Sequence, residues 1–301
     1  MRSFFITTET NNCDPVMQSY KLGPIDGRFK FWCMGPRQDG NMVLAVERWA
    51  RSLQGGPGVI MYIGAVPSPQ FGVGVPGIDT LRMVGKVAPT IHVCFDGADS
   101  PWWAPLEAYK AAGCFAAQVN IDGGKCAPAD LVTLCPVETA PYDGPEVERD
   151  IRLGFAGGVG TPLRWHMVKR LEEVAGLQIR ARQQGYETPD YAEYAGFMRR
   201  CRMVLNVPVT GSGQFMHVKS RVIEAGLAGC AVLEHKDSPA HGWFPGALIP
   251  FGTMEELEAL AVGMPEAVVA EHGRRLSGLV RREWHPDRIW GDMLRVAGFG
   301  A

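Results

Sequence analysis

Short apolar runs alternate with amphipathic stretches along the first half of the chain. Apolar runs predict buried strands at 59–63, 90–95 and 115–120, a last short run follows at 131–134, and helical patterns lie at 43–50 and 103–112. Short, continuously apolar strands separated by helices are typical of parallel β-α-β units. The pattern therefore predicts an α/β domain built on a parallel sheet.

A segment of different character interrupts this alternation. Residues 136–150 are rich in proline and acidic side chains and show no apolar periodicity, which is typical of a linker. We therefore expect one domain over residues 1–137, a linker over 138–150 and a second domain over 151–301.

The alternation restarts after the linker. Strands are expected at 151–156, 177–180, 203–207, 231–234 and 247–251, helices at 162–175, 191–201 and 217–228, and closing helices at 255–262, 266–282 and 286–296. The whole pattern predicts two Rossmann-like α/β domains with a cleft between them and C-terminal helices that close the chain. Because such sheets bind ligands at the carboxyl ends of their strands, we expect the functional residues there.

Charge and cysteine content narrow the picture. The formal net charge of −2 excludes a protein that is carried onto nucleic acid or a membrane by bulk positive charge. The second half is the more basic one and is therefore the better candidate for an anionic ligand. The eight cysteines form no C-x-x-C pair, and no apolar window is long enough for a membrane span, so we expect free thiols and a cytoplasmic protein.

Glycines and basic residues of the second half suggest a site for phosphate groups. The loop Gly157-Gly158-Val159-Gly160 lies between an expected strand and an expected helix, where backbone N–H groups bind phosphate. Lys219 and Arg221 open a later helix and would neutralise an anion. The alternatives are an ordinary tight turn and a solvated basic face. A dinucleotide fingerprint is disfavoured because Leu163 stands where its third glycine belongs.

Glu224 and Arg164, two more charged residues of this half, are also candidates for the site. Glu224 lies in an otherwise apolar helix, where a carboxylate is costly without a dedicated partner, so a functional role is favoured over an ion pair with Arg221. Arg164 either reaches the phosphates or pairs with Glu172 or Glu173.

Four segments of this half together resemble a known family. They are the linker with the first strand (136–157), Arg164 in the next helix, the sequence KSRVIEAGLAGCAVL at 219–233 and the sequence WHPDRIW at 284–290. They are similar to the nucleotide-sugar-binding domain of GT-B glycosyltransferases, and most to the group-1-like branch related to the CgeB-type spore-maturation enzymes. Two departures leave retention or inversion open: Met216 stands where retaining members often have a first Glu, and Cys230 follows Gly229 in a displaced triplet.

The resemblance implies a fold, a reaction and a set of roles. Residues 1–137 would form the acceptor side and residues 151–301 the donor side of an enzyme that moves a sugar from a nucleotide diphosphate sugar to a hydroxyl acceptor. The donor would be bound by Gly157, Gly158, Arg164, Lys219, Arg221 and Glu224, with Glu224 on the ribose hydroxyls. The resemblance implies no resident cofactor, and the sequence shows no metal-binding motif.

A base for the acceptor is expected in the first half. Asp96 is the first choice and Asp99 the second, because both follow a buried strand and a carboxylate there could accept the acceptor's proton. The alternative for Asp96 is a helix-capping or turn residue.

Two other functions stay open. The acceptor, a glycan or a small molecule on the leading hypothesis, could instead be hydroxymethylated DNA, since phage enzymes of the same architecture use it; the net charge of −2 counts against this. The chain could also be a nucleotide-sugar-binding module without catalysis.

Overall fold

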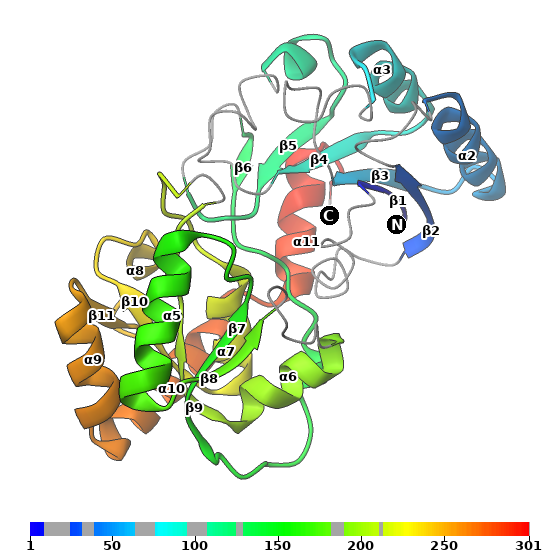
Figure 1. Ribbon diagram of the computed structural model, residues 1–301. Coiled ribbons are helices and arrows are strands. Elements are labelled where there is room, and N and C mark those ends of the chain that lie inside the picture. The colour runs from blue at the N-terminus through cyan, green and yellow to red at the C-terminus, as the bar shows by residue number, and fades with distance from the viewer. Residues whose placement is uncertain are drawn as a thin grey trace. The chain divides into compact units, whose positions relative to one another are not determined.

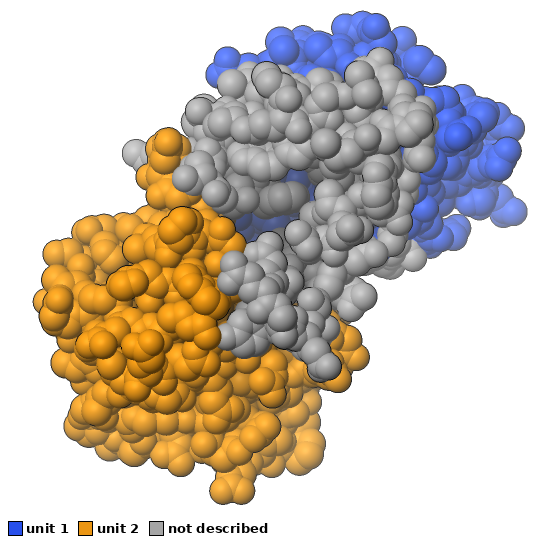
Figure 2. All heavy atoms as spheres, in the orientation of Figure 1, with its two compact units in different colours: residues 1–136, 287–301 blue, residues 137–286 orange. Residues whose placement is uncertain are grey.

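The computed structural model forms two compact units, coloured separately in Figure 2. Unit 1 comprises Met1–Pro136 and Asp287–Ala301, and unit 2 comprises Val137–Pro286. The structure describes residues 1–8, 25–31, 39–63, 76–94, 107–124, 129–181, 190–210 and 213–300.

Unit 1 is built on a six-stranded parallel sheet in the order β2-β1-β3-β4-β5-β6 (Figure 1). The strands are β1 (Arg2–Thr8), β2 (Ile25–Phe31), β3 (Gly58–Ile63), β4 (Thr90–Cys94), β5 (Ala117–Asn120) and β6 (Leu131–Val132). Every side chain of β4 and β5 is buried, as the continuous apolar runs predicted. The helices of this unit include α2 (Asp39–Ser52), α3 (Ile78–Val87) and α11 (Pro286–Val296).

The hydrophobic pattern predicted the central strands of unit 1 but not its first two. β2 is an edge strand that carries Asp26, Arg28 and Lys30 at alternate positions, so it lacks the apolar run by which the inner strands are recognised. Its neighbour β1 and the helix α3 were not predicted either, although β1 carries the apolar residues Phe4, Phe5 and Ile6.

Unit 2 is built on a five-stranded parallel sheet in the order β11-β10-β9-β7-β8. The strands are β7 (Ile151–Gly157), β8 (Gln178–Ala181), β9 (Cys201–Leu205), β10 (Ala231–His235) and β11 (Ile249–Phe251). The chain runs outward from β7 to β8 on one side and from β9 to β11 on the other. The reversal falls between β7 and β9, and ligands of such sheets bind at that point, beyond the carboxyl ends of the strands.

Some helices of unit 2 begin and end at local sequence signals, and others do not. The helices are η2 (Ala140–Tyr142), α5 (Pro162–Ala175), α6 (Tyr191–Arg200), α7 (Ser220–Ala228), α8 (Ala240–Trp243), α9 (Met254–Gly263) and α10 (Glu266–Glu283). The prediction of a helix over 162–175 is confirmed: Thr161 caps the N-terminus of α5, and Gly176 ends the helix in the left-handed conformation. α7 begins three residues later than predicted: the residues just before it pair with the segment after β9, through the bridge between Val209 and Met216 and the hydrogen bond from His217 N–H to Pro208 O.

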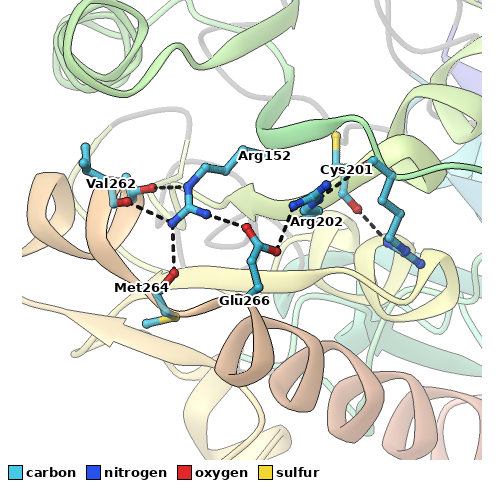
Figure 3. A network of polar contacts seen from close by, with 8 residues as sticks. Arg152, Cys201, Arg202, Val262, Met264 and Glu266 are labelled. Atoms are coloured by element: carbon cyan, nitrogen blue, oxygen red, sulfur yellow. Dashed lines mark hydrogen bonds and ion pairs between the residues drawn. The ribbon is translucent and has the colours of Figure 1, made fainter.

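Arginines at the amino ends of the strands fix two helices of unit 2 (Figure 3). Arg152 of β7 donates to Ala261 O, Val262 O and Met264 O, the carbonyls at the C-terminus of α9, and pairs with Glu266 at 2.6 Å. Arg202 of β9 pairs with the same carboxylate at 3.0 Å. The carbonyls that end a helix lack partners within it, and a carboxylate stabilises the start of one, so this network joins α9 to α10.

The division of the chain differs from the predicted domains in two respects. The predicted linker, residues 138–150, is part of unit 2, and the C-terminal end of the predicted second domain is not. We expected 151–301 as one domain, but unit 2 ends at Pro286 and α11 belongs to unit 1. α11 buries Ile289 and Met293. Helical periodicity predicts such an apolar stripe, but it does not specify the sheet against which the stripe packs.

None of the helices in the described part of the chain combines the length and apolar character that a membrane crossing needs.

Candidate functional site

The carboxyl ends of β7, β9 and β10 bring together three buried polar residues and a glycine from separate parts of the sequence. β7 ends at Gly157, Asn206 directly follows β9, and Glu234 is the penultimate residue of β10. Arg221 reaches them from the first turn of α7. These four residues, Gly157, Asn206, Arg221 and Glu234, are called the carboxyl-edge cluster below.

Arg221 is the centre of this cluster. Its side chain is buried, with 9% exposed, and its guanidinium lies over the ring of Phe155 at 4.8 Å. Nε donates to Ala156 O at 2.5 Å, and Nη1 donates to Asn206 Oδ1 at 2.8 Å. The planar guanidinium is thereby fixed against the end of β7, and it is not the solvated basic side chain of the alternative interpretation.

Gly157 lies directly against the remaining nitrogen of Arg221. The position that a Cβ would occupy is 2.0 Å from Arg221 Nη2, and the backbone φ of +143° also favours glycine. A residue with a side chain would displace the guanidinium. The glycine therefore allows Nη2 to lie beside the first residue of the predicted phosphate-binding loop.

Glu234 is the most deeply buried charged residue of the cluster. It is fully buried and accepts a hydrogen bond from Asn206 Nδ2 at 2.7 Å. Burial raises the pKa of this carboxyl to about 7, although hydrogen bonds from Ser238 and Asn206 and the positive charges of Arg221 and Lys219 oppose the shift. Strongly shifted pKa values are concentrated at functional sites, and this one adjoins the end of the sheet where a ligand is expected.

Arg164 fixes the glycine loop from the other side. It lies in the first turn of α5, where its backbone N–H donates to the capping Thr161. Nη1 donates to Gly158 O at 2.9 Å and Nη2 to Val209 O at 3.2 Å. The guanidinium therefore links the glycine loop to the segment after β9, and Glu172, one predicted partner, pairs with Lys169 instead.

The N-terminus of α7 adds positive charge to the same edge. Lys219 is its N-cap residue and makes no side-chain capping hydrogen bond. The positive charge of Lys219 opposes the rise in the pKa of Glu234 that burial causes. A helix N-terminus without a side-chain cap keeps backbone N–H groups available for an anion.

Glu224 lies one turn further along α7 in a buried group of tyrosines. Only 5% of the residue is exposed, and its Oε2 accepts a hydrogen bond from Tyr194 Oη at 2.6 Å. Tyr191 stacks on Tyr194 and packs edge-on against Tyr142. Burial, followed by the negative charge of Glu224, raises the pKa values of Tyr142 and Tyr194 well above the usual range. The carboxylate has the dedicated partner that its apolar surroundings require.

The predicted donor residues are thus distributed over one edge of one sheet. Gly157, Gly158, Arg164 and Arg221 meet there, Lys219 acts on the cluster through its charge, and Glu224 lies deeper on α7. Asp96 and Asp99, the candidate bases, lie outside the described residues.

Three residues at or near this site were not predicted. Glu234 could have been found, because a carboxylate at the end of an apolar parallel strand is as costly as Glu224 in its helix. Asn206 and Tyr194 carry no local signal, since their partners are 28 and 30 residues away in the sequence. Among the described residues, no group of three His, Cys, Asp or Glu side chains is arranged to hold a metal ion.

Comparison with solved structures identifies proteins of the same fold. HepE of Anabaena, in complex with UDP and glucose, matches with a TM-score of 0.57 at 10% identity over 98% of both chains. A glycosyltransferase from Rickettsia africae matches with a TM-score of 0.55 at 10% identity, again over 98% of both chains. An alpha-glucosyltransferase in complex with UDP-glucose and DNA containing an abasic site matches with a TM-score of 0.59 at 7% identity over 99% of both chains.

These matches confirm the predicted fold. The chain has the α/β fold of the GT-B glycosyltransferases, with two parallel sheets. No family model matches the sequence, and a comparison with curated proteins finds no match. The narrower resemblance to the CgeB-type branch therefore stays a prediction.

Proposed function

We propose that the protein is a glycosyltransferase that uses a nucleotide diphosphate sugar as donor. The observation that carries the proposal is the position of Arg221 Nη2 beside Gly157, at the point where the strand order of the unit 2 sheet reverses. Neighbours of the same fold were crystallised with UDP or UDP-glucose, which supports a nucleotide sugar as the ligand of this edge.

Each donor group has a candidate partner under this proposal. The glycine loop, Lys219 and Arg221 would hold the diphosphate, and Arg164 would keep the loop in place through Gly158 O. Glu224 would accept hydrogen bonds from the ribose hydroxyls. No resident cofactor is part of the proposal, because two basic side chains supply positive charge where a bound cation otherwise would.

The reaction would proceed by displacement at the anomeric carbon. The bond from this carbon to the diphosphate oxygen breaks, a bond to the acceptor oxygen forms, and the acceptor proton passes to a base, for which Asp96 and then Asp99 are proposed. Negative charge develops on the leaving diphosphate, so Arg221 and Lys219 would bind the transition state more strongly than the ground state.

Calorimetry with UDP, GDP and dTDP tests the donor half of the proposal. We expect one nucleoside diphosphate to bind with a dissociation constant below a millimolar, and Arg221→Met to remove the binding. Slow release of free sugar from the matching nucleotide sugar would support transfer chemistry. Absence of binding to all three at millimolar concentration would contradict the proposal.

DNA is the second candidate acceptor. It is favoured by the match with the alpha-glucosyltransferase, whose complex contains DNA, and disfavoured by the net charge of −2. A gel-shift assay at low salt, with duplexes that do or do not carry hydroxymethylcytosine, distinguishes the two acceptor classes. Binding without turnover on any acceptor would instead indicate a donor-binding module without catalysis.

A further inference from the structure

Asn206 connects the two charged members of the carboxyl-edge cluster. Its amide Oδ1 accepts from Arg221 Nη1 at 2.8 Å, and its Nδ2 donates to Glu234 Oε2 at 2.7 Å. Asn206 and Glu234 are both completely buried, whereas Arg221 lies against the glycine loop. The three residues form a chain of hydrogen bonds that runs from inside unit 2 to the proposed phosphate site.

The chemistry of these groups fixes the orientation of the asparagine amide. A guanidinium only donates hydrogen bonds, so it requires the amide oxygen, and Glu234 Oε2 accepts from the amide nitrogen. A flipped amide would place donor against donor at Arg221. Arg221 and Glu234 together therefore fix which way Asn206 points, and the amide oxygen of Asn206 in turn holds the guanidinium of Arg221 in place.

We propose that Asn206 and Glu234 are positioning residues for the donor diphosphate: through their hydrogen bonds they hold Arg221 with Nη2 beside Gly157, the first residue of the glycine loop. This inference rests on the proposed function, because it assigns Arg221 to the diphosphate. Neither residue touches the ligand. Both act through Arg221, so they affect the binding of the phosphates and not that of the nucleoside.

Protonation of Glu234 is coupled to the binding of the diphosphate. Among the described residues, the charged groups that act most on this carboxyl are Arg221 and Lys219, both at the start of α7. The flanking strands present Asn206 and Pro250, which carry no charge. A bound diphosphate brings negative charge to the two cations and raises the pKa of Glu234 further above about 7. Binding then takes up protons, and by linkage the affinity falls as the pH rises through that value.

The first experiment separates phosphate binding from nucleoside binding. Calorimetry of the full chain uses UDP-glucose, GDP-mannose and dTDP-glucose, each beside its free nucleoside. We expect Asn206→Ala to weaken the nucleotide sugar that binds best by about tenfold, because it removes a hydrogen bond to a charged group, and to leave the nucleoside within about twofold. Asn120→Ala is the matched control: Asn120 is also buried at a strand end but bonds within its own loop in unit 1.

The second experiment uses Glu234→Gln, whose amide oxygen still accepts from Asn206. Nucleotide sugars are suitable probes because their phosphates, unlike the terminal phosphate of UDP, gain no proton between pH 6 and 8. We expect the wild-type affinity to fall about fivefold or more over this range and the variant affinity to stay constant. At pH 6, where Glu234 is mostly protonated, the two proteins should bind alike.

The outcomes separate the inference from the proposed function. If wild-type protein binds none of the three nucleotide sugars, both fail. The positioning role alone is overturned if wild-type protein binds but Asn206→Ala weakens sugar nucleotide and nucleoside equally, or neither. It is also overturned if Glu234→Gln keeps the wild-type pH profile. This last comparison decides the matter even if Asn206→Ala does not fold.

Discussion

The two ends of the unit 2 sheet use arginine in different ways. At the amino end, Arg152 donates to carbonyls that end α9 and pairs with Glu266, whose side chain is 52% exposed. At the carboxyl end, Arg221 is almost buried and is joined through Asn206 to Glu234, which has no exposed surface.

The two arrangements differ in which guanidinium nitrogens are hydrogen-bonded to the protein. Arg152 uses Nε, Nη1 and Nη2 on groups of the protein itself, so its network serves the packing of two helices (Figure 3). Arg221 bonds the protein through Nε and Nη1, and Nη2 lies beside a glycine with no side chain. A buried charge is costly, and one whose nitrogen lies beside the proposed phosphate-binding loop indicates a binding role more strongly than a stabilising one.

Arg221→Met should have the largest effect of any single change at either end. It leaves Asn206 and Glu234 buried without their cation, so we expect unfolding in urea to show a loss of about 3 kcal/mol. Calorimetry should show no remaining binding of a nucleoside diphosphate. Arg221→Lys keeps the charge but not the planar fork, and an affinity equal to wild type in this variant would contradict the geometric role of the guanidinium.

Gly157→Ala should come next. Its methyl group would meet Arg221 Nη2, and φ is +143°, so we expect a loss of about 2 kcal/mol of unfolding free energy. Gly158→Ala is the stability control, since a Cβ there meets nothing within 4 Å. Equal stability of the two variants would show that the contact with Arg221 is not tight.

Between pH 5 and 7, Glu234 at the carboxyl end should make the stability of the protein depend on pH. The pKa of Glu234 is raised from 4.5 to about 7, so between these values the folded state holds a proton that the unfolded chain has lost. The unfolding free energy of wild type should therefore fall with rising pH more steeply than that of Glu234→Gln, by up to about 1.4 kcal/mol per unit. Urea unfolding at pH 5, 6 and 7 measures the two slopes, and parallel slopes would refute the raised pKa.

Glu266→Gln should have the smallest effect. Its ion pairs with Arg152 and Arg202 are partly exposed, and such pairs contribute below about 1 kcal/mol. Urea unfolding should show this small loss, and calorimetry should show unchanged nucleotide binding. A loss of binding similar to that of Arg221→Met would abolish the distinction between the two ends.

The sequence predicted much of this fold because its signals are local. The inner strands are continuous apolar runs, and α5 has both a capping threonine and a terminating glycine. The edge strand β2 was missed because its alternating charges lack such a run. The unit to which α11 belongs could not be predicted, because the periodicity of one helix does not show which other elements its apolar face packs against.

The candidate site was predicted in part for the same reason. The glycine loop and the opening of α7 are visible as motifs, so Gly157 and Arg221 were identified. The chain from Arg221 through Asn206 to Glu234 joins residues that are 15 and 28 positions apart. Its existence depends on the strand order of the sheet, which brings the ends of β9 and β10 side by side.

Hydrogen–deuterium exchange in the presence and absence of UDP-glucose locates the bound ligand on the chain. It therefore tests directly whether the donor binds at the carboxyl-edge cluster. We expect slower exchange at residues 157–164 and 219–222, at the carboxyl end of the unit 2 sheet. Exchange at 149–152 and 261–266, at the amino end, should not change. Protection at the amino end or in unit 1 alone would contradict the assignment of the donor to the carboxyl-edge cluster.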